Sequence, residues 1–154
     1  MSRPLTPGEV RLARSVFGDR IDYGRVRICG GGPGRTAITL GSRIHFPSPA
    51  PNDASAGALP LQAWFVHEMT HVLQFQSAPL RTLWSWFVTL ASGGYHRARG
   101  YRYAMPLAHW GAYNLEQQAS MVEHAFVLRE QGACAAAPEG ASLAAYRACV
   151  PFLD

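Results

Sequence analysis

The sequence predicts an α+β fold, because one helix is followed by a group of short strands and then by several helices. The chain has 154 residues, of which 48% are hydrophobic and 16% are charged. That balance is typical of a compact globular protein and excludes wholesale disorder. The chain contains no internal repeat and no linker, so we expect a single domain over residues 1–154.

The first third of the chain predicts a capped helix and a small sheet. Thr6-Pro7-Gly8-Glu9 is typical of a helix start, with Thr6 as the N-cap and Glu9 closing a capping box, and Gly18 ends the helix. Runs of β-forming residues follow over residues 25–29, 36–40 and 43–46. Gly41-Ser42, between the last two runs, is a two-residue hairpin signal. We therefore expect these strands to form a small antiparallel sheet.

The rest of the chain is mostly helical in pattern. A strong helix candidate ends before Pro79, and we expect helices over residues 61–76, 80–91, 113–131 and 142–149. Residues 47–57 are a loop rich in Pro, Ser and Ala, and residues 94–110 are irregular and aromatic. We expect the sheet to pack against the helix over residues 61–76, which has the helix over residues 113–131 as a neighbour.

Residues 67–71 read His-Glu-Met-Thr-His. Histidines four residues apart on a helix share one face, about 5–6 Å apart at Cβ, so both imidazoles can reach one tetrahedral metal ion. Glu68 lies beside such a metal without binding it and is placed to take a proton from water. Apolar residues flank the motif, and these three side chains are costly to bury there unless a metal compensates. The pattern predicts a Zn²⁺ site; two exposed histidines are the alternative.

A zinc site of this kind needs a third protein ligand. A third histidine six residues after His71 is excluded, because Ser77 occupies that position. The helix over residues 113–131 offers two carboxylates, Glu116 and Glu123, which share one narrow face beside an apolar stripe. Either carboxylate can point inward at the metal. An ordinary solvated helix face is the alternative interpretation.

These residues resemble a known family. The pattern His-Glu-x-x-His-x-x-Gln, followed by an aromatic stretch and Tyr-Asn-x-Glu-Gln-Gln-Ala, is similar to small bacterial zincins that are related to Vgr proteins and found near contractile or toxin-delivery systems. Residues 5–9 and 17–23 also look like that group. The resemblance covers most of residues 5–130. Many zincins share the metal motif, whereas the second pattern is more particular.

The resemblance implies a zincin-like fold of the gluzincin type, with Glu116 as the third ligand. In better-known gluzincins an acidic residue four positions after the ligand glutamate supports a histidine. Ser120 occupies that position here. We therefore expect the histidines to be oriented by Ser120, by Glu123 or by a backbone carbonyl.

Peptide hydrolysis also needs a hydrogen-bond donor for the oxyanion that develops on the scissile carbonyl. The eligible side chains, in the segment before the second ligand helix, are Tyr101, Tyr103, His109 and Tyr113. We select Tyr103 and His109 as candidate catalytic donors, against the alternative that they are packing residues. We expect His45 and Phe46 on the edge strand of the sheet, where an extended peptide can add as a further strand.

The leading functional hypothesis is zinc-dependent hydrolysis of peptide bonds. Zinc held by His67, His71 and Glu116 lowers the pKa of a bound water, and Glu68 takes its proton and passes it to the leaving amine. The expected substrate is a peptide, a protein or the peptide part of peptidoglycan. The alternative is a catalytically weak, zinc-stabilised adaptor or cargo module of a delivery apparatus, with secretion-system proteins as partners.

Charge and cysteine content bear on partners and location. The formal charge of +4 comes from scattered arginines with one cluster, Arg97, Arg99 and Arg102, and no recognised nucleic-acid module surrounds it, so we expect no nucleic-acid partner. Three cysteines without a close pair favour a reducing compartment, although Cys134 and Cys149 could form a disulfide. With no signal peptide and no membrane span, we expect a cytoplasmic protein in the producing cell, with export by a specialised secretion system.

Overall fold

The computed structural model describes residues 2–91 and 100–153. In chain order its main elements are β1 (Ser2–Pro4), α1 (Pro7–Phe17), β2 (Arg27–Cys29), β3 (Ile38–Leu40), β4 (Arg43–His45), α2 (Leu59–Ser77), α3 (Pro79–Ala91), α4 (Leu115–Gln131) and α5 (Leu143–Cys149). Short 3-10 helices lie at η1 (Tyr23–Arg25), η2 (Ala54–Ala56) and η5 (Trp110–Ala112). Within the described residues, five α-helices and one four-stranded sheet confirm the predicted α+β class.

The sheet is mixed, so the prediction of an antiparallel sheet was wrong. Its strand order is β1-β2-β4-β3; β2 and β4 are parallel, and the two outer pairs are antiparallel. The predicted hairpin at Gly41-Ser42 does join β3 to β4, and Gly41 has a φ of 60° that favours glycine. The glycine-rich connection over residues 30–37 leads from β2 to β3, which lies at the edge of the sheet. The hairpin then places β4 between β2 and β3.

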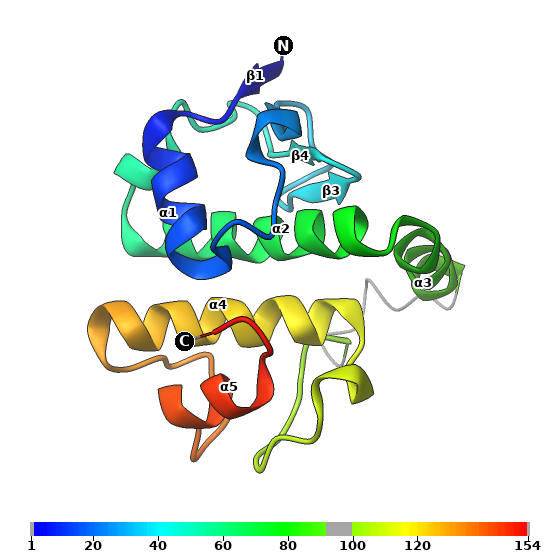
Figure 1. The fold of residues 1–154 in the computed structure, drawn as a ribbon. Coiled ribbons are helices and arrows are strands. Elements are labelled where there is room, and N and C mark those ends of the chain that lie inside the picture. Colours follow the sequence, from blue (N-terminus) through cyan, green and yellow to red (C-terminus); the bar gives the residue numbers. More distant parts are fainter. Residues whose placement is uncertain (1, 92–99, 154) are drawn as a thin grey trace.

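The edge strands of the sheet are β1 and β3 and not, as predicted, the strand that carries His45. β4 lies between β2 and β3, and Phe46, which follows it, is 1% exposed in the core. β3 instead lies above α2, at the outer side of the sheet (Figure 1). An extended peptide that pairs with this edge would therefore meet Ile38–Leu40.

Local sequence explains where the helices begin. α1 has the predicted capping box, because the Thr6 hydroxyl accepts from the backbone N–H of Glu9 and the Glu9 carboxylate accepts from that of Thr6. α2 begins at Leu59 rather than at residue 61, since a proline is tolerated in the first turn of a helix. α4 begins at Leu115 rather than at residue 113, because Asn114 caps it in a second capping box.

Helix α2 lies at the centre of the molecule. The sheet and α1 lie on one side of it, α4 runs alongside its other side, and α5 packs on the far side of α4 (Figure 1). Phe65, Val66 and Met69 of α2 are fully buried in a cluster that extends into the sheet, α1, α4 and α5. A helix that is apolar on both sides belongs between two layers. This arrangement places residues 67–71 in the interior.

Three other expectations can be compared with the structure. The cysteines are free, so Cys134 and Cys149 do not form a disulfide. Among the described helices, none combines the length and the apolar character that crossing a bilayer requires. Of the basic cluster, Arg102 is exposed, whereas Arg97 and Arg99 lie outside the described residues.

Candidate metal centre

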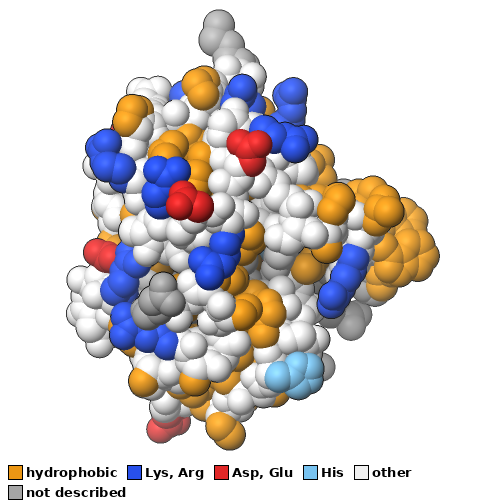
Figure 2. Space-filling model, viewed as in Figure 1, with side chains coloured by type: hydrophobic (Ala, Val, Ile, Leu, Met, Phe, Trp, Pro, Cys, Tyr) orange, Lys and Arg blue, Asp and Glu red, His pale blue; other side chains and the backbone are white. Residues whose placement is uncertain are grey.

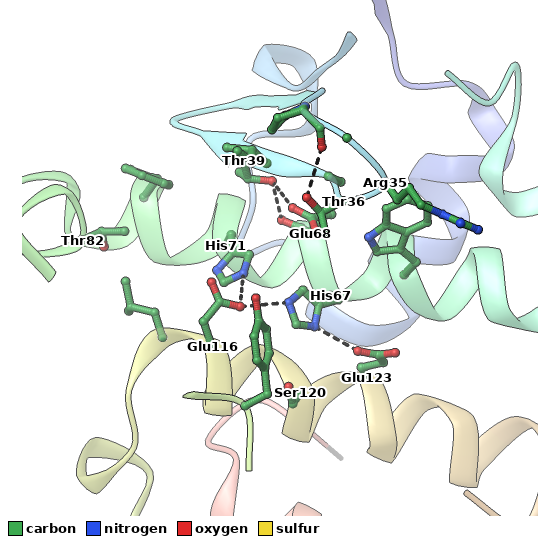
Figure 3. A pocket seen from close by; sticks show the side chains of 18 residues that line it. Arg35, Thr36, Thr39, His67, Glu68, His71, Thr82, Glu116, Ser120 and Glu123 are labelled. Atoms are coloured by element: carbon green, nitrogen blue, oxygen red, sulfur yellow. Dashed lines mark hydrogen bonds and ion pairs between the residues drawn. The ribbon is translucent and has the colours of Figure 1, made fainter. Parts of the chain in front are cut away.

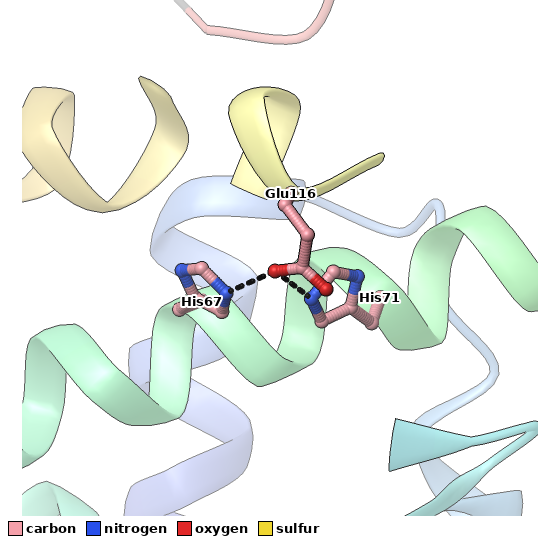
Figure 4. Close-up of side chains that lie close together, drawn as sticks. All are labelled: His67, His71 and Glu116. Carbon is pink, nitrogen blue, oxygen red and sulfur yellow. Dashed lines mark hydrogen bonds and ion pairs between the residues drawn. The ribbon is translucent and has the colours of Figure 1, made fainter. Parts of the chain in front are cut away.

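Three side chains from two helices converge on one point. His67 and His71 lie one turn apart on α2, and Glu116 approaches them from the first turn of α4 (Figure 4). Their ligand atoms all lie within 4.8 Å of one another. Oε2 of Glu116 is 3.3 Å from Nε2 of His67 and 3.3 Å from Nε2 of His71. The structure thus brings together the three residues that the sequence analysis selected as metal ligands.

The spacing of these atoms fits a tetrahedral metal ion. Zinc bonds of about 2.0–2.1 Å at tetrahedral angles separate neighbouring ligand atoms by about 3.3 Å. The same separation joins Glu116 to each histidine. Two imidazoles and one carboxylate are also a ligand set that zinc accepts. The group can therefore hold a metal ion of zinc's size and geometry.

Each histidine ring is held from its far side. Nδ1 of His67 is 2.9 Å from Oε2 of Glu123, and Nδ1 of His71 is 2.9 Å from Oε1 of Gln74. A neutral imidazole that donates from Nδ1 presents a lone pair at Nε2. Both Nε2 lone pairs would then face the carboxylate of Glu116, and a cation between them satisfies all three groups.

Gln74 ties the orientation of His71 to the start of α4. Its amide NH₂ donates to the backbone oxygen of Leu115 at 3.1 Å and to Oε1 of Gln118 at 3.0 Å. Because both amide protons are engaged there, the side-chain oxygen of Gln74 is turned toward His71. The contact that fixes the ring therefore also holds α2 against the helix that supplies the third ligand.

The supports of the two histidines were only partly foreseen. Glu123, one of the expected sources, faces Nδ1 of His67 rather than the metal position, while Ser120 lines the cavity above the group. Gln74 was not identified as a support. Its position three residues after His71 was the available signal, because residues at that spacing are neighbours on a helix.

Burial and the neighbouring side chains shift the pKa values of the group in opposite directions. Burial raises the pKa of Glu116, but the neighbouring histidines outweigh it and hold the pKa below its ordinary value. Burial lowers the pKa of His67, yet the bonds to Glu116 and Glu123 outweigh burial and raise the pKa to about 10. For His71 burial is likewise opposed, chiefly by Glu116, and its pKa is raised. The metal-free His67 ring therefore holds a second proton at neutral pH, which a metal ion must displace.

Glu68 lies on an adjacent side of α2, facing the sheet. Its Oε2 accepts a 2.7 Å hydrogen bond from Oγ1 of Thr39 on the edge strand β3 (Figure 3). Glu68 is 4% exposed and lines the same cavity as the histidines. One residue corresponds to a turn of about 100° around a helix. The offset from His67 therefore places this carboxylate beside the metal group instead of within it.

A cavity of about 740 Å³ opens above the group (Figure 3). β3 and residues 33–37 line one side, and α4 lines the other. Trp64 and Phe75 line it on either side of the histidines along α2, and Arg35 is the one arginine among the described lining residues. The volume lies within the range of small-ligand and peptide-binding clefts, about 300–1,000 Å³.

Among the described residues, Tyr101 is the tyrosine that lines this cavity. Its ring centroid lies 6.4 Å from that of His67. Burial, together with the nearby carboxylates of Glu116 and Glu68, raises the pKa of Tyr101 to about 12. The hydroxyl therefore keeps its proton across the physiological pH range and remains a donor.

The structure does not bring the two selected donors to the group. The hydroxyl of Tyr103 lies 2.5 Å from Nδ1 of His124 and 2.6 Å from the hydroxyl of Tyr146, in a contact that joins α4 to α5. His109 caps η5 and is not among the described residues that line the cavity. The local sequence around these aromatic residues does not reveal which of them faces the cavity.

Comparison with known proteins identifies relatives of this chain. No family model matches it. The type VI secretion system spike protein VgrG2b of Pseudomonas aeruginosa is 33% identical over 143 residues, which cover 84% of this chain and 13% of the spike protein. The chain therefore spans a small part of that protein's length.

A solved structure, the effector domain of Pseudomonas aeruginosa VgrG2b, matches this fold with a TM-score of 0.69 and 30% sequence identity. The match covers 98% of this chain and 83% of that domain. The similarity thus extends over nearly all the elements that form the metal centre and the cavity. This protein belongs to the family of the VgrG2b effector domain.

Proposed function

We propose that this protein is a zinc-dependent peptidase that acts as an effector of a type VI secretion system. The catalytic part rests on one observation: His67, His71 and Glu116 converge at the base of a cleft that Glu68 also lines. The secretion part rests on family membership, since the related VgrG2b is the spike protein of such a system.

The ligand residues and their supports have separate tasks. A zinc ion at this centre would supply Lewis acidity, which polarises a peptide carbonyl and lowers the pKa of a water molecule. His67, His71 and Glu116 would hold it. Glu123 and Gln74 hold the two rings, with Nδ1 donating to them and Nε2 turned toward the centre.

Glu68 is the general base. It takes a proton from the attacking water and later gives it to the leaving amine. The same residue thus acts first as a general base and then as a general acid. The 2.7 Å hydrogen bond from Thr39 holds the carboxylate at the cavity. Because Thr39 belongs to β3, the same strand that borders the substrate cleft also positions the base.

The cleft suits an extended peptide. One side of β3 pairs with β4, and within the described residues no strand pairs with its other side, which borders the cavity. A peptide that adds to this edge would lie across residues 67–71. We assign oxyanion stabilisation to Tyr101, because it lines the cavity near His67 and retains its proton.

The test compares wild type with Glu68→Gln, and Glu139→Gln serves as a control on an exposed glutamate. Metal content is measured by mass spectrometry, and hydrolysis of proteins, peptide mixtures and peptidoglycan fragments by liquid chromatography with mass spectrometry. We expect about one zinc per chain in all three proteins and cleavage by all but Glu68→Gln. Equal cleavage by Glu68→Gln and wild type would contradict the assignment of Glu68 as the general base. Bound zinc without hydrolysis of any substrate would favour the adaptor function.

A further inference from the structure

We propose that helix α3 is a docking surface for an anionic lipid bilayer. α3 lies at one end of α2, at the side of the molecule (Figure 1), and Figure 2 shows hydrophobic side chains gathered over it. The exposed residues, here called the α3 patch, are Leu80 (83% exposed), Leu83 (51%), Trp84 (68%), Phe87 (58%) and Val88 (47%). Contiguous apolar surface of this kind marks an interaction site.

The face that α3 exposes is apolar, unlike that of an ordinary surface helix. Residues of the α3 patch recur at spacings of three and four, so they occupy one face. The polar Thr82, in contrast, is 3% exposed, and its hydroxyl donates a 2.8 Å hydrogen bond to the backbone oxygen of Gln74. A surface helix normally buries its apolar face and exposes its polar one. The α3 patch is therefore an apolar face turned outward, while Thr82 faces the protein.

The charge around the α3 patch selects an anionic partner. Helix α3 contains no Asp or Glu, and Arg81 is its one charged residue. Arg81 is exposed and lies two turns before Val88, at the border of the patch. An arginine beside a Trp, Phe and Leu face is typical of helices that lie in a membrane interface, because its stem covers apolar surface while the guanidinium reaches lipid phosphate.

The dimensions of α3 favour a bilayer surface over the other occupants. The helix has 13 residues, so it is about 20 Å long, shorter than the roughly 30 Å hydrocarbon core that a spanning helix must cross. The five residues of the α3 patch are far fewer than the roughly 20–30 residues that each side of a standard protein interface contributes. A second copy would also bring Arg81 against a like charge, whereas a bilayer supplies both an apolar medium and negative charge.

Docking through the α3 patch would also orient the cleft. Thr82 of α3 lines the cavity together with Phe75, at the C-terminal end of α2. A protein held at a bilayer by α3 would therefore present this end of the cleft toward the membrane surface. The docking itself does not depend on peptide hydrolysis, so it can fail or succeed independently of the proposed function.

The experiment measures flotation of the purified protein with vesicles of phosphatidylcholine alone and of an equimolar mixture with phosphatidylglycerol. We expect wild type to bind the mixed vesicles more tightly. Trp84→Ser combined with Phe87→Ser should lower that affinity about tenfold or more, since both side chains lose apolar contact. Arg81→Gln should lower it about fivefold, the contribution of one basic residue near an anionic surface.

Leu40→Ser is the matched control, because Leu40 is an exposed apolar residue (42%) on β3, outside the patch; it should bind vesicles as wild type does. Circular dichroism melting checks that each variant is folded. If the double variant does not fold, the result for Arg81→Gln decides the test. Failure of wild type to bind mixed vesicles, or equal binding by the patch variants, would overturn the proposal. A dimer in light scattering that the double variant dissociates would assign the patch to a second copy and overturn it as well.

Discussion

Glu123 lies 2.9 Å from Nδ1 of His67, on the side of the ring opposite to Glu116. Two carboxylates of α4, seven residues apart, thus contact the two nitrogens of one imidazole from α2. Seven residues are about two helical turns, so the support comes one turn later than the position of Ser120. The carboxylate that holds His67 therefore comes from the same helix as Ser120, one turn later.

Removing Glu123 should weaken metal binding without removing a ligand. For Glu123→Ala we expect zinc affinity to fall about 10–100-fold, because the ring of His67 loses the acceptor that sets its tautomer and orientation. Competition with a chromophoric chelator measures the affinity. Glu130→Ala, which removes an exposed glutamate of the same helix, is the control. Glu116→Ala should lower the zinc affinity more than Glu123→Ala does. The reverse order would make Glu123 the ligand and Glu116 the supporting residue.

Zinc binding should release protons, and the apparent affinity should rise with pH. The pKa of His67 is raised to about 10 by Glu116 and Glu123 against the effect of burial. Its ring is therefore protonated in the metal-free protein at neutral pH and must lose a proton to bind metal. Apparent affinity then increases from neutral pH up to about pH 10. Calorimetry in buffers of different ionisation enthalpy counts the protons, and zero release would contradict the protonated state.

Thr39 should affect catalysis but not metal content. Thr39→Val keeps the shape of the side chain and removes the 2.7 Å hydrogen bond to Glu68. We expect kcat to fall about tenfold, a fraction of the 10²–10⁴ that a positioned general base contributes. Zinc stoichiometry should stay the same. Thr36→Val, an exposed position on the same side of the cavity, is the control, and equal effects of both variants would argue against positioning of the base.

Substitutions of two tyrosines should have different effects, one on the free energy of unfolding and the other on catalysis. Tyr103→Phe removes hydrogen bonds to His124 and Tyr146, so urea unfolding should show a loss of about 1–2 kcal/mol. Tyr101→Phe should leave stability nearly unchanged and lower kcat, because it removes the donor assigned to the oxyanion. The opposite pattern would restore Tyr103, the donor selected from the sequence, to the catalytic group.

Arg35 should influence which peptides are cleaved. Its exposed side chain lines the cavity, where the remaining charged residues of the described lining are the histidines and glutamates around the centre. We expect Arg35→Gln to lower kcat/KM for peptides with a carboxylate near the scissile bond about threefold relative to neutral peptides, the size of an exposed ion pair. Arg11→Gln, on α1, is the control. An unchanged ratio would mean that Arg35 does not contact substrate.

The helices were predictable because their signals are local. The capping box at Thr6 and Glu9 involves atoms three residues apart, and the helix that carries His67 was found from its own apolar residues. The sheet was predicted less well. β1 is three residues long, and the parallel pairing of β2 with β4 joins strands that are not consecutive. Such pairing depends on how the connection over residues 30–37 runs in space, which no short pattern encodes.

The sequence by itself determined that His67 and His71 share a face and that Glu68 lies beside them, because helical periodicity alone sets those relations. Only the tertiary structure decided that Glu116 meets the histidines while Glu123 supports one of them, and that Tyr101, not Tyr103, faces the cavity. Those relations depend on the packing of α2 between α4 and β3, which is the sum of many contacts between residues far apart in the chain. Local chemistry can be read from spacing, whereas the partner across an interface is set by the fold.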